Sequence, residues 1–368
     1  MKVFIRPTIA WLSVALFLVF GAGWMSALAT PAVSIGLFAW LFLVIIWVAF
    51  GVVHEAEELA EMLGEPFGTL ILTLSIVLIE VALISAVMIS AQDASTLARD
   101  TMFAVLMIVL NGVVGLGLLI GGARHHEQSY NLQGASAYLA VVIPLSTIAL
   151  VLPKFTASTS DSTLTSLQAT AFSVLTIGLY GIFLWLQTGR HKGFFVEPAN
   201  SDEPVVIEAQ AVSPPLSRRK LIGHVVMLLV NILPIVILSK SLAKVLDHGI
   251  AAMGAPPALG GVVIAMLVFT PEGISALIAI RRNQLTRAIN LCLGGATSTV
   301  GLTVPAVLII GLITGQKVIL GLPPASIVLL AATLILSGLT FSGSRTTMLE
   351  GAVHLSLFAV FLVLVFSP

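Results

Sequence analysis

Long apolar runs separated by short polar stretches dominate the chain. A run of roughly 20 apolar residues, folded as an α-helix, matches the thickness of a bilayer. We place eleven such helices, at residues 7–28, 31–53, 67–90, 101–122, 136–152, 166–187, 221–239, 259–280, 288–315, 323–341 and 348–366. The pattern predicts an all-α polytopic membrane protein with eleven transmembrane helices.

The first apolar run has a second interpretation, as a signal peptide. Lys2 and Arg6 precede it, and Ala27-Leu28-Ala29 resembles a cleavage pattern. However, the run exceeds the roughly 7–15 residues of a signal-peptide core, and another apolar run follows at once. We therefore interpret it as a transmembrane helix.

One long polar interruption divides the chain. Residues 188–217 are rich in Pro, Ser, Glu and Asp, a composition typical of a partly disordered linker. Five predicted helices lie between the first helix and this linker, and five follow it. The predicted organisation is an N-terminal extra transmembrane helix in 1–30, a first five-helix repeat in 31–187, the polar cytoplasmic linker, and a second five-helix repeat in 218–368.

The two halves share a weak sequence similarity. LARDTMFAVLMIVLNGVVG, which begins at Leu97, aligns with LTRAINLCLGGATSTVGLT, which begins at Leu285, and the alignment pairs Arg99 with Arg287. Because each half has an odd number of helices, the second half would be inverted in the membrane relative to the first. The sequence predicts a 5+5 inverted-topology repeat.

The distribution of basic residues sets the predicted orientation. With the N-terminus inside, 12 of the 17 Lys and Arg residues lie on the cytoplasmic side. Such an excess is the usual mark of cytoplasmic loops. We predict a cytoplasmic N-terminus and a C-terminus on the opposite side.

Composition agrees with a membrane protein and excludes other classes. The chain is 58% hydrophobic and 9% charged, against about 25% charged residues in soluble domains. Its net charge of zero gives no basic surface for nucleic acid. No Walker phosphate loop is present, so we expect no nucleotide partner. The single cysteine, Cys292, excludes a disulfide within the chain.

Two carboxylates stand out because they lie inside apolar helices. Glu80 lies near the middle of 67–90, and Glu272 lies inside 259–280. An acidic side chain at that depth costs roughly 2.5–3.5 kcal/mol on translocon-type scales, so it calls for a function. Each is in the second helix of its half. Such a pair can be neutralised by protons or by a cation, and the competition between these two ligands would produce exchange. We predict that Glu80 and Glu272 form a shared cation and proton site, and that they are the metal ligands of a transported Ca²⁺.

Further oxygen ligands are required, because Ca²⁺ takes roughly 6–8 of them. The weaker candidates are hydroxyl and amide side chains in or near the same helices: Thr73, Ser75, Ser85, Asn111, Thr270, Ser275, Thr297, Ser298 and Thr299. Pro271, next to Glu272, would also free a backbone carbonyl one turn earlier. The alternative for each hydroxyl is a hydrogen bond to its own helix.

An acidic stretch precedes the helix of Glu80. His54, Glu58, Glu61 and Glu65 are spaced to lie along one helical face. They could form a cytoplasmic acidic mouth that concentrates cations, or simply the solvated face of an interfacial helix. No second His follows at the spacing of a zinc-protease motif. The pairs His125-His126 and Glu350/His354, with His248, are interpreted as loop, cap or proton-wire groups.

The sequence resembles a known transporter family. GEPFGTLILTLSIVLIEVALISA, FTPEGISAL, RRNQLTRAINLCLG and TVGLTVPAV are similar to ChaA-type bacterial calcium/sodium–proton antiporters. These belong to the cation/proton exchanger branch of the calcium/cation antiporter superfamily. The resemblance implies a ten-helix inverted-repeat core plus one extra helix, with the essential acidic residues at Glu80 and Glu272. It also implies a bundle around the first helix of each half that slides past the rest.

One departure from that family bears on the ion. The Gly-Asn pair that often precedes each glutamate is replaced by Ile76-Val77 and by Val268-Phe269. The Thr-Pro-Glu sequence is closer to the sodium/calcium exchanger version of the motif.

We therefore expect a secondary antiporter of a bacterial inner membrane, and not an enzyme. It would exchange cytoplasmic calcium, with sodium or potassium as further candidates, for external protons, without any cofactor. Its partners would be these ions and the lipid bilayer, and a homo-oligomer stays open. The alternatives are a sodium/calcium exchanger that uses no protons and a cation channel. An intramembrane enzyme is disfavoured because neither carboxylate has a paired His.

Overall fold

A computed structural model of the chain describes residues 2–64, 67–90, 95–159, 161–198 and 218–367. Nearly all of its regular elements are helical, including three π-helical stretches (η1, η2 and η4) and one 3₁₀ turn (η3). In chain order the elements are α1 (Lys2–Ser26), α2 (Pro31–Leu63), α3 (Phe67–Ser90), α4 (Leu97–Leu106), η1 (Met107–Val113), α5 (Val114–His125), β1 (Gln128–Ser129), α6 (Leu132–Ser146), η2 (Thr147–Val151), α7 (Leu152–Phe155), α8 (Ser166–Thr188), η3 (Lys192–Phe195), α9 (Arg218–Met253), α10 (Ala258–Arg281), α11 (Leu285–Ser298), η4 (Thr299–Thr303), α12 (Val304–Thr314), α13 (Pro324–Thr340), β2 (Arg345–Thr346) and α14 (Met348–Phe366).

Ten helical segments of the described ranges are long and apolar enough to cross a membrane, and α13 is a shorter apolar helix of 17 residues. Three of the ten join α-helices through π-helical turns: Leu97–His125, Leu132–Phe155 and Leu285–Thr314. A π-helical turn adds a residue without ending the helix, so each of these segments is one span. The predicted all-α polytopic architecture is confirmed in the described residues, with ten long helical segments and one shorter helix where eleven transmembrane helices were predicted.

Two helices extend well past their predicted ends. α2 continues to Leu63 instead of stopping at residue 53, and α9 continues to Met253 instead of residue 239. A hydropathy window stops at the first charges, whereas the helices continue because buried apolar residues return beyond them, as with Leu59 on α2 and Leu242 on α9. The stretch that contains His54 therefore belongs to α2 itself.

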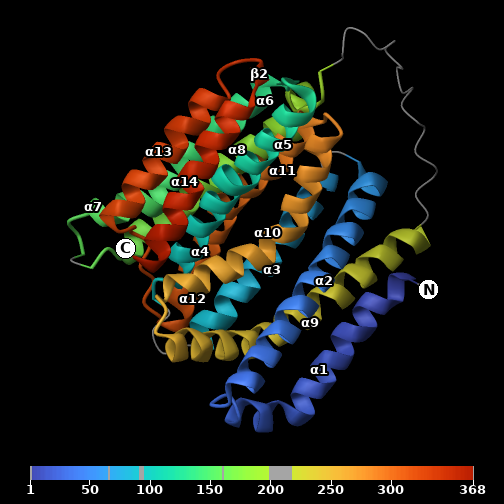
Figure 1. Cartoon of the computed structure of the whole chain (residues 1–368), viewed down its shortest axis with the longest axis vertical. Helices are drawn as coiled ribbons and strands as arrows, with labels where there is room; N and C mark the ends of the chain where they lie inside the picture. Colours follow the sequence, from blue (N-terminus) through green and yellow to red (C-terminus); the bar gives the residue numbers. More distant parts are fainter. Residues whose placement is uncertain (1, 65–66, 91–94, 160, 199–217, 368) are drawn as a thin grey trace.

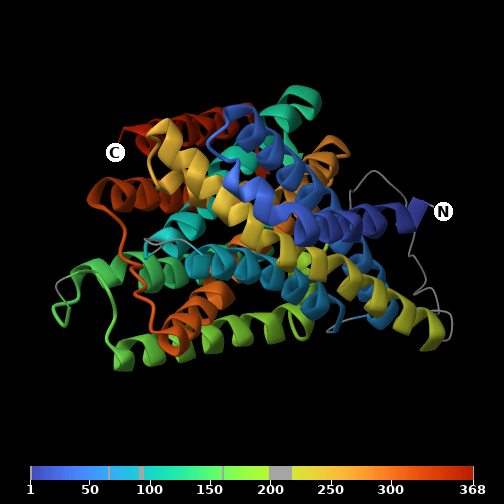
Figure 2. The ribbon, with the colours of Figure 1, turned by 90° about the horizontal axis from the view of Figure 1, so that it is seen from below.

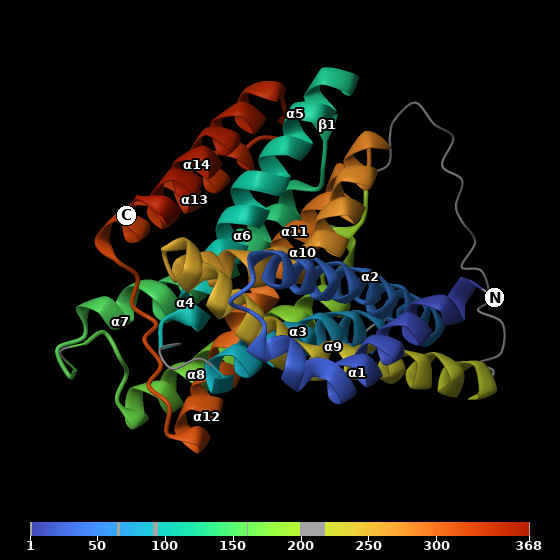
Figure 3. The same ribbon diagram turned by 60° about the horizontal axis from the view of Figure 1, so that its bottom comes forward.

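The helices separate into two groups (Figures 1 and 3). α2 packs along most of α9, and α1 lies against both, so these three form one side of the molecule. α13 and α14 lie on the far side from α1, which is also clear from below (Figure 2). α3, α4, α10 and α11 lie between the groups, where the two candidate carboxylates are found. Large apolar side chains on the outer helices, such as Leu18 on α1 and Leu167 on α8, are 75% and 80% exposed, as lipid-facing positions require.

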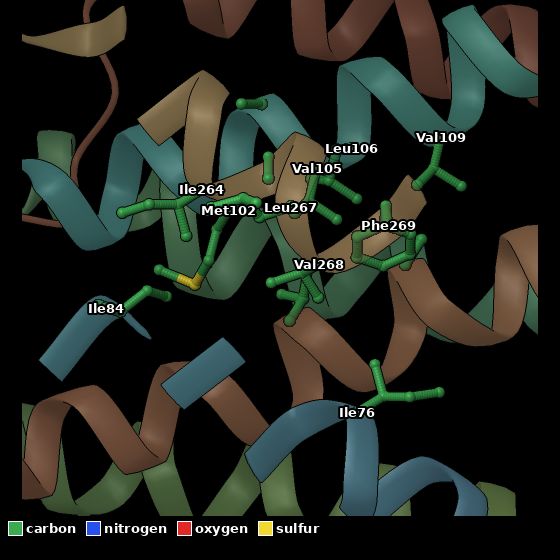
Figure 4. Packing of buried hydrophobic residues seen from close by; sticks show 14 of the residues in the cluster. Ile76, Ile84, Met102, Val105, Leu106, Val109, Ile264, Leu267, Val268 and Phe269 are labelled. Atoms are coloured by element: carbon green, nitrogen blue, oxygen red, sulfur yellow. The ribbon is translucent and has the colours of Figure 1, made fainter. Parts of the chain in front are cut away.

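α10 packs more extensively against α4 than against any other element. Figure 4 shows Met102, Val105 and Leu106 of this segment packed against Ile264 and Leu267 of α10. All five side chains are buried. In a membrane, helices associate largely through such close packing, because the surrounding lipid is itself apolar. This packing fixes the helix that carries Glu272.

Gly261 permits the closest approach between α10 and α4. A Cβ atom at this position would lie 2.6 Å from the backbone carbon of Asp100 and from the backbone nitrogen of Thr101. Gly261→Val is expected to destabilise the protein by about 1–3 kcal/mol or more, because backbone atoms cannot move aside as side chains can. Thermal unfolding in detergent measures this loss. Gly338→Val, on α13 with nothing within 4 Å of the added Cβ, is the matched control, and an equal loss there would contradict the argument.

Glycines also bring α5 and α14 together. A Cβ at Gly351 would lie 2.5 Å from the Leu119 nitrogen, and one at Gly115 would lie 2.9 Å from the Cβ of His354. The short antiparallel pair β1–β2 holds the same end of these helices, with Gln128 opposite Thr346. This contact places the His354 ring inside the helix bundle.

Candidate functional site

Glu80 on α3 and Glu272 on α10 both lie inside the protein. The Glu80 residue is 0% exposed and Glu272 is 7% exposed. The helices that carry them, α3 and α10, pack against each other. A buried carboxylate is costly unless it is neutralised or bonded. Each carboxylate has one buried oxygen without a hydrogen-bond partner among the described residues, Glu80 Oε1 and Glu272 Oε2, but only Glu80 is also bonded to hydroxyl side chains.

Glu80 is bonded to two hydroxyls from the second half of the chain. Thr299 Oγ1 and Thr303 Oγ1 both donate to Glu80 Oε2, at 2.9 Å and 3.0 Å. Both threonines belong to η4, where they are four residues apart and share one face. Thr299 was among the predicted ligands. Thr303 was not, although its spacing from Thr299 was a signal that could have found it.

Glu272 has an open side. Its Oε2 has no hydrogen-bond partner among the described residues. Glu272 lines a cavity of about 600 Å³, together with Thr73, Tyr180 and Ser298. A Cβ at Gly295, also on the cavity wall, would lie 3.0 Å from Glu272 Oε2. A Cβ there would also lie 2.6 Å from Phe269 Cε1, so Gly295 allows α11 to pack closely against the Phe269 ring and the Glu272 carboxylate.

The outer part of the same cavity is polar. Gln187, Asn290, Lys192 and Arg287 line it, and Gln187 Nε2 donates to Tyr138 Oη at 2.7 Å. Lys192 and Arg287 are exposed. The cavity thus connects the end of α8 and the start of α11 with the Glu272 carboxylate.

A short segment after α8 is fastened beside this cavity. Asn290 Nδ2 donates to the Phe195 carbonyl at 2.7 Å, and Glu197 accepts hydrogen bonds from the backbone nitrogens of Thr286 and Arg287. Burial raises the pKa of Glu197, against the lowering effect of these backbone donors. The carboxylate caps the first turn of α11, where unpaired N–H groups favour an anion.

Several predicted hydroxyl ligands bond to their own helices. They do so through backbone carbonyls one turn earlier: Ser75 to Ile71, Ser85 to Val81, Thr270 to Met266, Thr297 to Leu293 and Ser298 to Gly295. Of this group only Ser298 lines the cavity of Glu272. Ser275 lines a different cavity, described below.

Asn111 lies in a buried network of its own. Its Nδ2 donates to Thr333 Oγ1 at 2.8 Å, and its Oδ1 is 3.0 Å from His354 Nδ1. His354 Nε2 is 3.0 Å from Thr340 Oγ1. Asn111, Thr333 and His354 are each 0% exposed. Here Asn111 is thus bonded to α13 and α14, and His354 has a structural partner that the sequence did not reveal.

The acidic stretch of α2 borders a second cavity, of about 400 Å³. It is lined by His54, Glu55, Glu57, Asn231 and Ser275, with Arg6 from α1. Glu55, which was not predicted as a site residue, is buried, and its Oε2 is 2.7 Å from His224 Nδ1 on α9. This pair links α2 to α9.

The other residues of the predicted acidic mouth are placed differently. Glu58 is half-buried and Glu61 is exposed. Neither is among the residues that line the second cavity. Glu65 lies outside the described residues. The linker of 188–217 is described only up to residue 198.

The chain matches the family model described as "Sodium/calcium exchanger protein" over residues 33–189 and 223–367. It is 40% identical over 323 residues to "Putative ionic transporter y4hA" of Sinorhizobium fredii, covering 87% of this chain and 85% of that protein. It is 38% identical to "Sodium-potassium/proton antiporter ChaA" of Escherichia coli, covering 87% and 86%.

Solved structures share the fold. "Structure of native YfkE" superimposes with a TM-score of 0.73 at 17% identity, covering 99% of this chain and 100% of that one. "Crystal Structure of H+/Ca2+ Exchanger CAX" gives a TM-score of 0.64 at 15% identity, covering 98% and 89%. The family match extends over most of both halves. The chain is therefore a multi-pass membrane protein of a transporter family, and it belongs to the sodium/calcium exchanger family of calcium/cation antiporters.

Proposed function

We propose that this chain is a cation/proton antiporter in which Glu80 and Glu272 form the shared cation and proton site. It would export calcium, and sodium or potassium in addition, from the cytoplasm of a bacterial cell in exchange for external protons. The observation that carries the proposal is the buried carboxylate pair, with one member bonded to hydroxyls and the other open to a cavity.

The chemistry of exchange follows from competition for the same oxygens. An ion that reaches Glu272 through the cavity meets one carboxylate directly, and the second lies on the neighbouring helix α3. Low dielectric surroundings disfavour two bare negative charges, so the pair releases a cation only when protons replace it. Coupling then needs no separate device.

The repeat supports alternating access. The pairing of Leu97 with Leu285 also pairs Asn111 with Thr299 and places the π-helical stretches η1 and η4 at overlapping positions. Inverted repeats with an ion site at their interface are a recurrent design of secondary transporters. In the predicted orientation the open cavity faces the cytoplasm, because Lys192 and Arg287 lie at its outer end.

Names of relatives point to different ions. ChaA of Escherichia coli is named a sodium-potassium/proton antiporter, whereas CAX is named an H⁺/Ca²⁺ exchanger. The experiment must therefore test the cations one at a time. The amide side chain that often precedes each glutamate is missing at Ile76-Val77 and at Val268-Phe269. Its absence favours a site that is less selective than one built for a single ion.

Everted membrane vesicles provide the test. Respiration makes the interior acidic, and a pH-sensitive dye reports the loss of the gradient when calcium, sodium or potassium is added. We expect dye recovery with at least one cation in vesicles that contain the protein, and none in vesicles without it. No recovery with any cation would contradict proton exchange. Sodium-dependent calcium uptake without proton movement would indicate the sodium/calcium exchanger alternative.

A further inference from the structure

The bonds around His354 define its protonation pattern. Asn111 Nδ2 donates to Thr333, so Asn111 Oδ1 faces His354 and accepts from it. A neutral His354 must therefore carry its proton on Nδ1, and its Nε2 accepts from Thr340. The Thr333 hydroxyl in turn donates to the Leu329 carbonyl at 2.9 Å, which ends this series of hydrogen bonds. Each donor in this buried series has an acceptor, which holds the Asn111 amide in one orientation.

The two halves use equivalent positions differently. Thr299, the repeat counterpart of Asn111, donates to Glu80 across the interface between the halves. Asn111 does not make the corresponding bond, and Glu272 Oε2 stays without a partner among the described residues. α10 nevertheless packs against η1, where a Cβ at Gly273 would lie 3.3 Å from Val113 Cγ2. Asn111 thus lies on a segment that packs against the helix of Glu272.

The fifth helices of the halves explain the difference. α8 and α14 begin with the same capping box, formed by Thr165 with Gln168 and by Thr347 with Glu350. Aligning these caps places Phe172 at the position of His354. A phenyl ring offers no hydrogen bond, so the first half has no group equivalent to His354 to hold Thr299 away from Glu80.

We propose that His354 is a positioning residue that holds Asn111 away from Glu272 in the conformation described here, and that Asn111 moves to Glu272 in the opposite-facing conformation. The inference rests on the proposed alternating-access function. When the halves of an inverted repeat exchange their arrangements, Glu272 takes the contacts that Glu80 makes here. The His354–Asn111 bond is then present in one conformation only, so it biases the equilibrium between them.

Two cysteine reporters test this bias in opposite directions. Cys292, the single natural cysteine and a buried one, is first replaced by alanine. Leu291→Cys then reports the cavity that is open here. The second reporter is Met102→Cys. Met102 is the repeat counterpart of Asn290, and it is 0% exposed here, among the buried side chains of Figure 4. In the opposite conformation this position would line the cavity that the first half forms, as Asn290 lines the cavity that is open here. A maleimide reagent labels each reporter in the purified full chain, so neither membrane orientation nor transport enters the measurement.

His354→Leu is expected to raise the labelling rate of Met102→Cys about fivefold, because the loss of one buried hydrogen bond shifts the equilibrium between the two conformations by about that factor. The labelling rate of Leu291→Cys should fall or stay level. His354→Asn, which keeps an N–H donor near the position of Nδ1, should restore the original rates. Thr340→Val should give a smaller shift in the same direction. Ser356→Ala, on the same helix with its hydroxyl bonded to the Val353 carbonyl, should leave both rates unchanged.

A merely structural role for His354 gives a different result. Loosening of the fold would raise the labelling rates of both reporters together, and that outcome overturns the proposal. An unchanged labelling rate for Met102→Cys also overturns it. So does a failure of His354→Asn to restore the original labelling rates. The vesicle assay distinguishes a failure of the His354 proposal from a failure of the proposed function. Dye recovery with unresponsive reporters refutes only the role of His354, whereas responsive reporters without dye recovery refute proton exchange and retain the two conformations.

Discussion

Glu272→Gln is expected to reduce cation-dependent proton movement in everted vesicles about a hundredfold, to the background of vesicles without the protein. The amide keeps the size of the side chain but can neither ionise nor release a proton at neutral pH. The loss of a charged contact costs about 1.5–3 kcal/mol, and 1.4 kcal/mol is a factor of ten. Glu80→Gln should give a loss of similar size, because in the proposed mechanism both carboxylates bind the same ion.

The matched control for these variants is Glu127→Gln. Glu127 lies between α5 and β1 and is exposed, so the same chemical change there should leave exchange within twofold of the original rate, as expected for a surface charge in water. Abundance of each variant in the vesicles must be measured in parallel. Normal exchange by Glu80→Gln or Glu272→Gln would remove the pair from the mechanism.

The second large effect is expected from the hydroxyls on Glu80. The double variant Thr299→Val/Thr303→Val removes both donors to Glu80 Oε2 without a large change in volume. Hydrogen bonds to an ionised acceptor contribute about 1.5–3 kcal/mol each, so we expect the KM for the cation to rise at least about tenfold. Initial rates of dye recovery over a range of cation concentrations measure this change.

Thr297→Val serves as the comparison for the threonine pair. Thr297 precedes the same η4 stretch, but its hydroxyl donates to the Leu293 carbonyl of its own helix. Its loss should leave KM nearly unchanged. Because Thr299 and Thr303 share one oxygen, the single variants should be non-additive. A double variant with an unaltered KM would mean that Glu80 does not bind the ion while bonded as it is here.

The sequence predicted a candidate site where charged residues interrupt apolar helices. Glu80 and Glu272 stood out for this reason, and the structure places both inside the bundle. Thr299 was a candidate among nine, and nothing in its local sequence separated it from Thr297, which bonds to its own helix. That distinction depends on which side of a helix faces α3, and hence on tertiary packing.

Long-range partners were beyond the reach of the sequence. Asn111 was predicted as an ion ligand, yet its partner here is His354, 243 positions along the chain. Glu55 was passed over because a glutamate in an acidic stretch usually lies in water, but His224 from the other half pairs with it in a buried position. The ends of α2 and α9 were misjudged because buried apolar residues, such as Leu59 and Leu242, return beyond the first charges and let each helix continue.

The helix α1 is fastened to both α2 and α9 and presents an apolar outer face. Trp11 Nε1 on α1 donates to the Val230 carbonyl on α9 at 3.0 Å, and Trp40 Nε1 on α2 donates to Ser13 Oγ on α1 at 3.1 Å. α1 lies outside the residues that the family model matches, yet it is fastened to both helices of the pair. Any displacement of α2 and α9 during exchange therefore carries α1 with it, and with it an outer face of exposed leucine and phenylalanine side chains. If α2 and α9 move in the proposed exchange cycle, we therefore expect the barrier to turnover to depend on the hydrocarbon thickness of the host membrane.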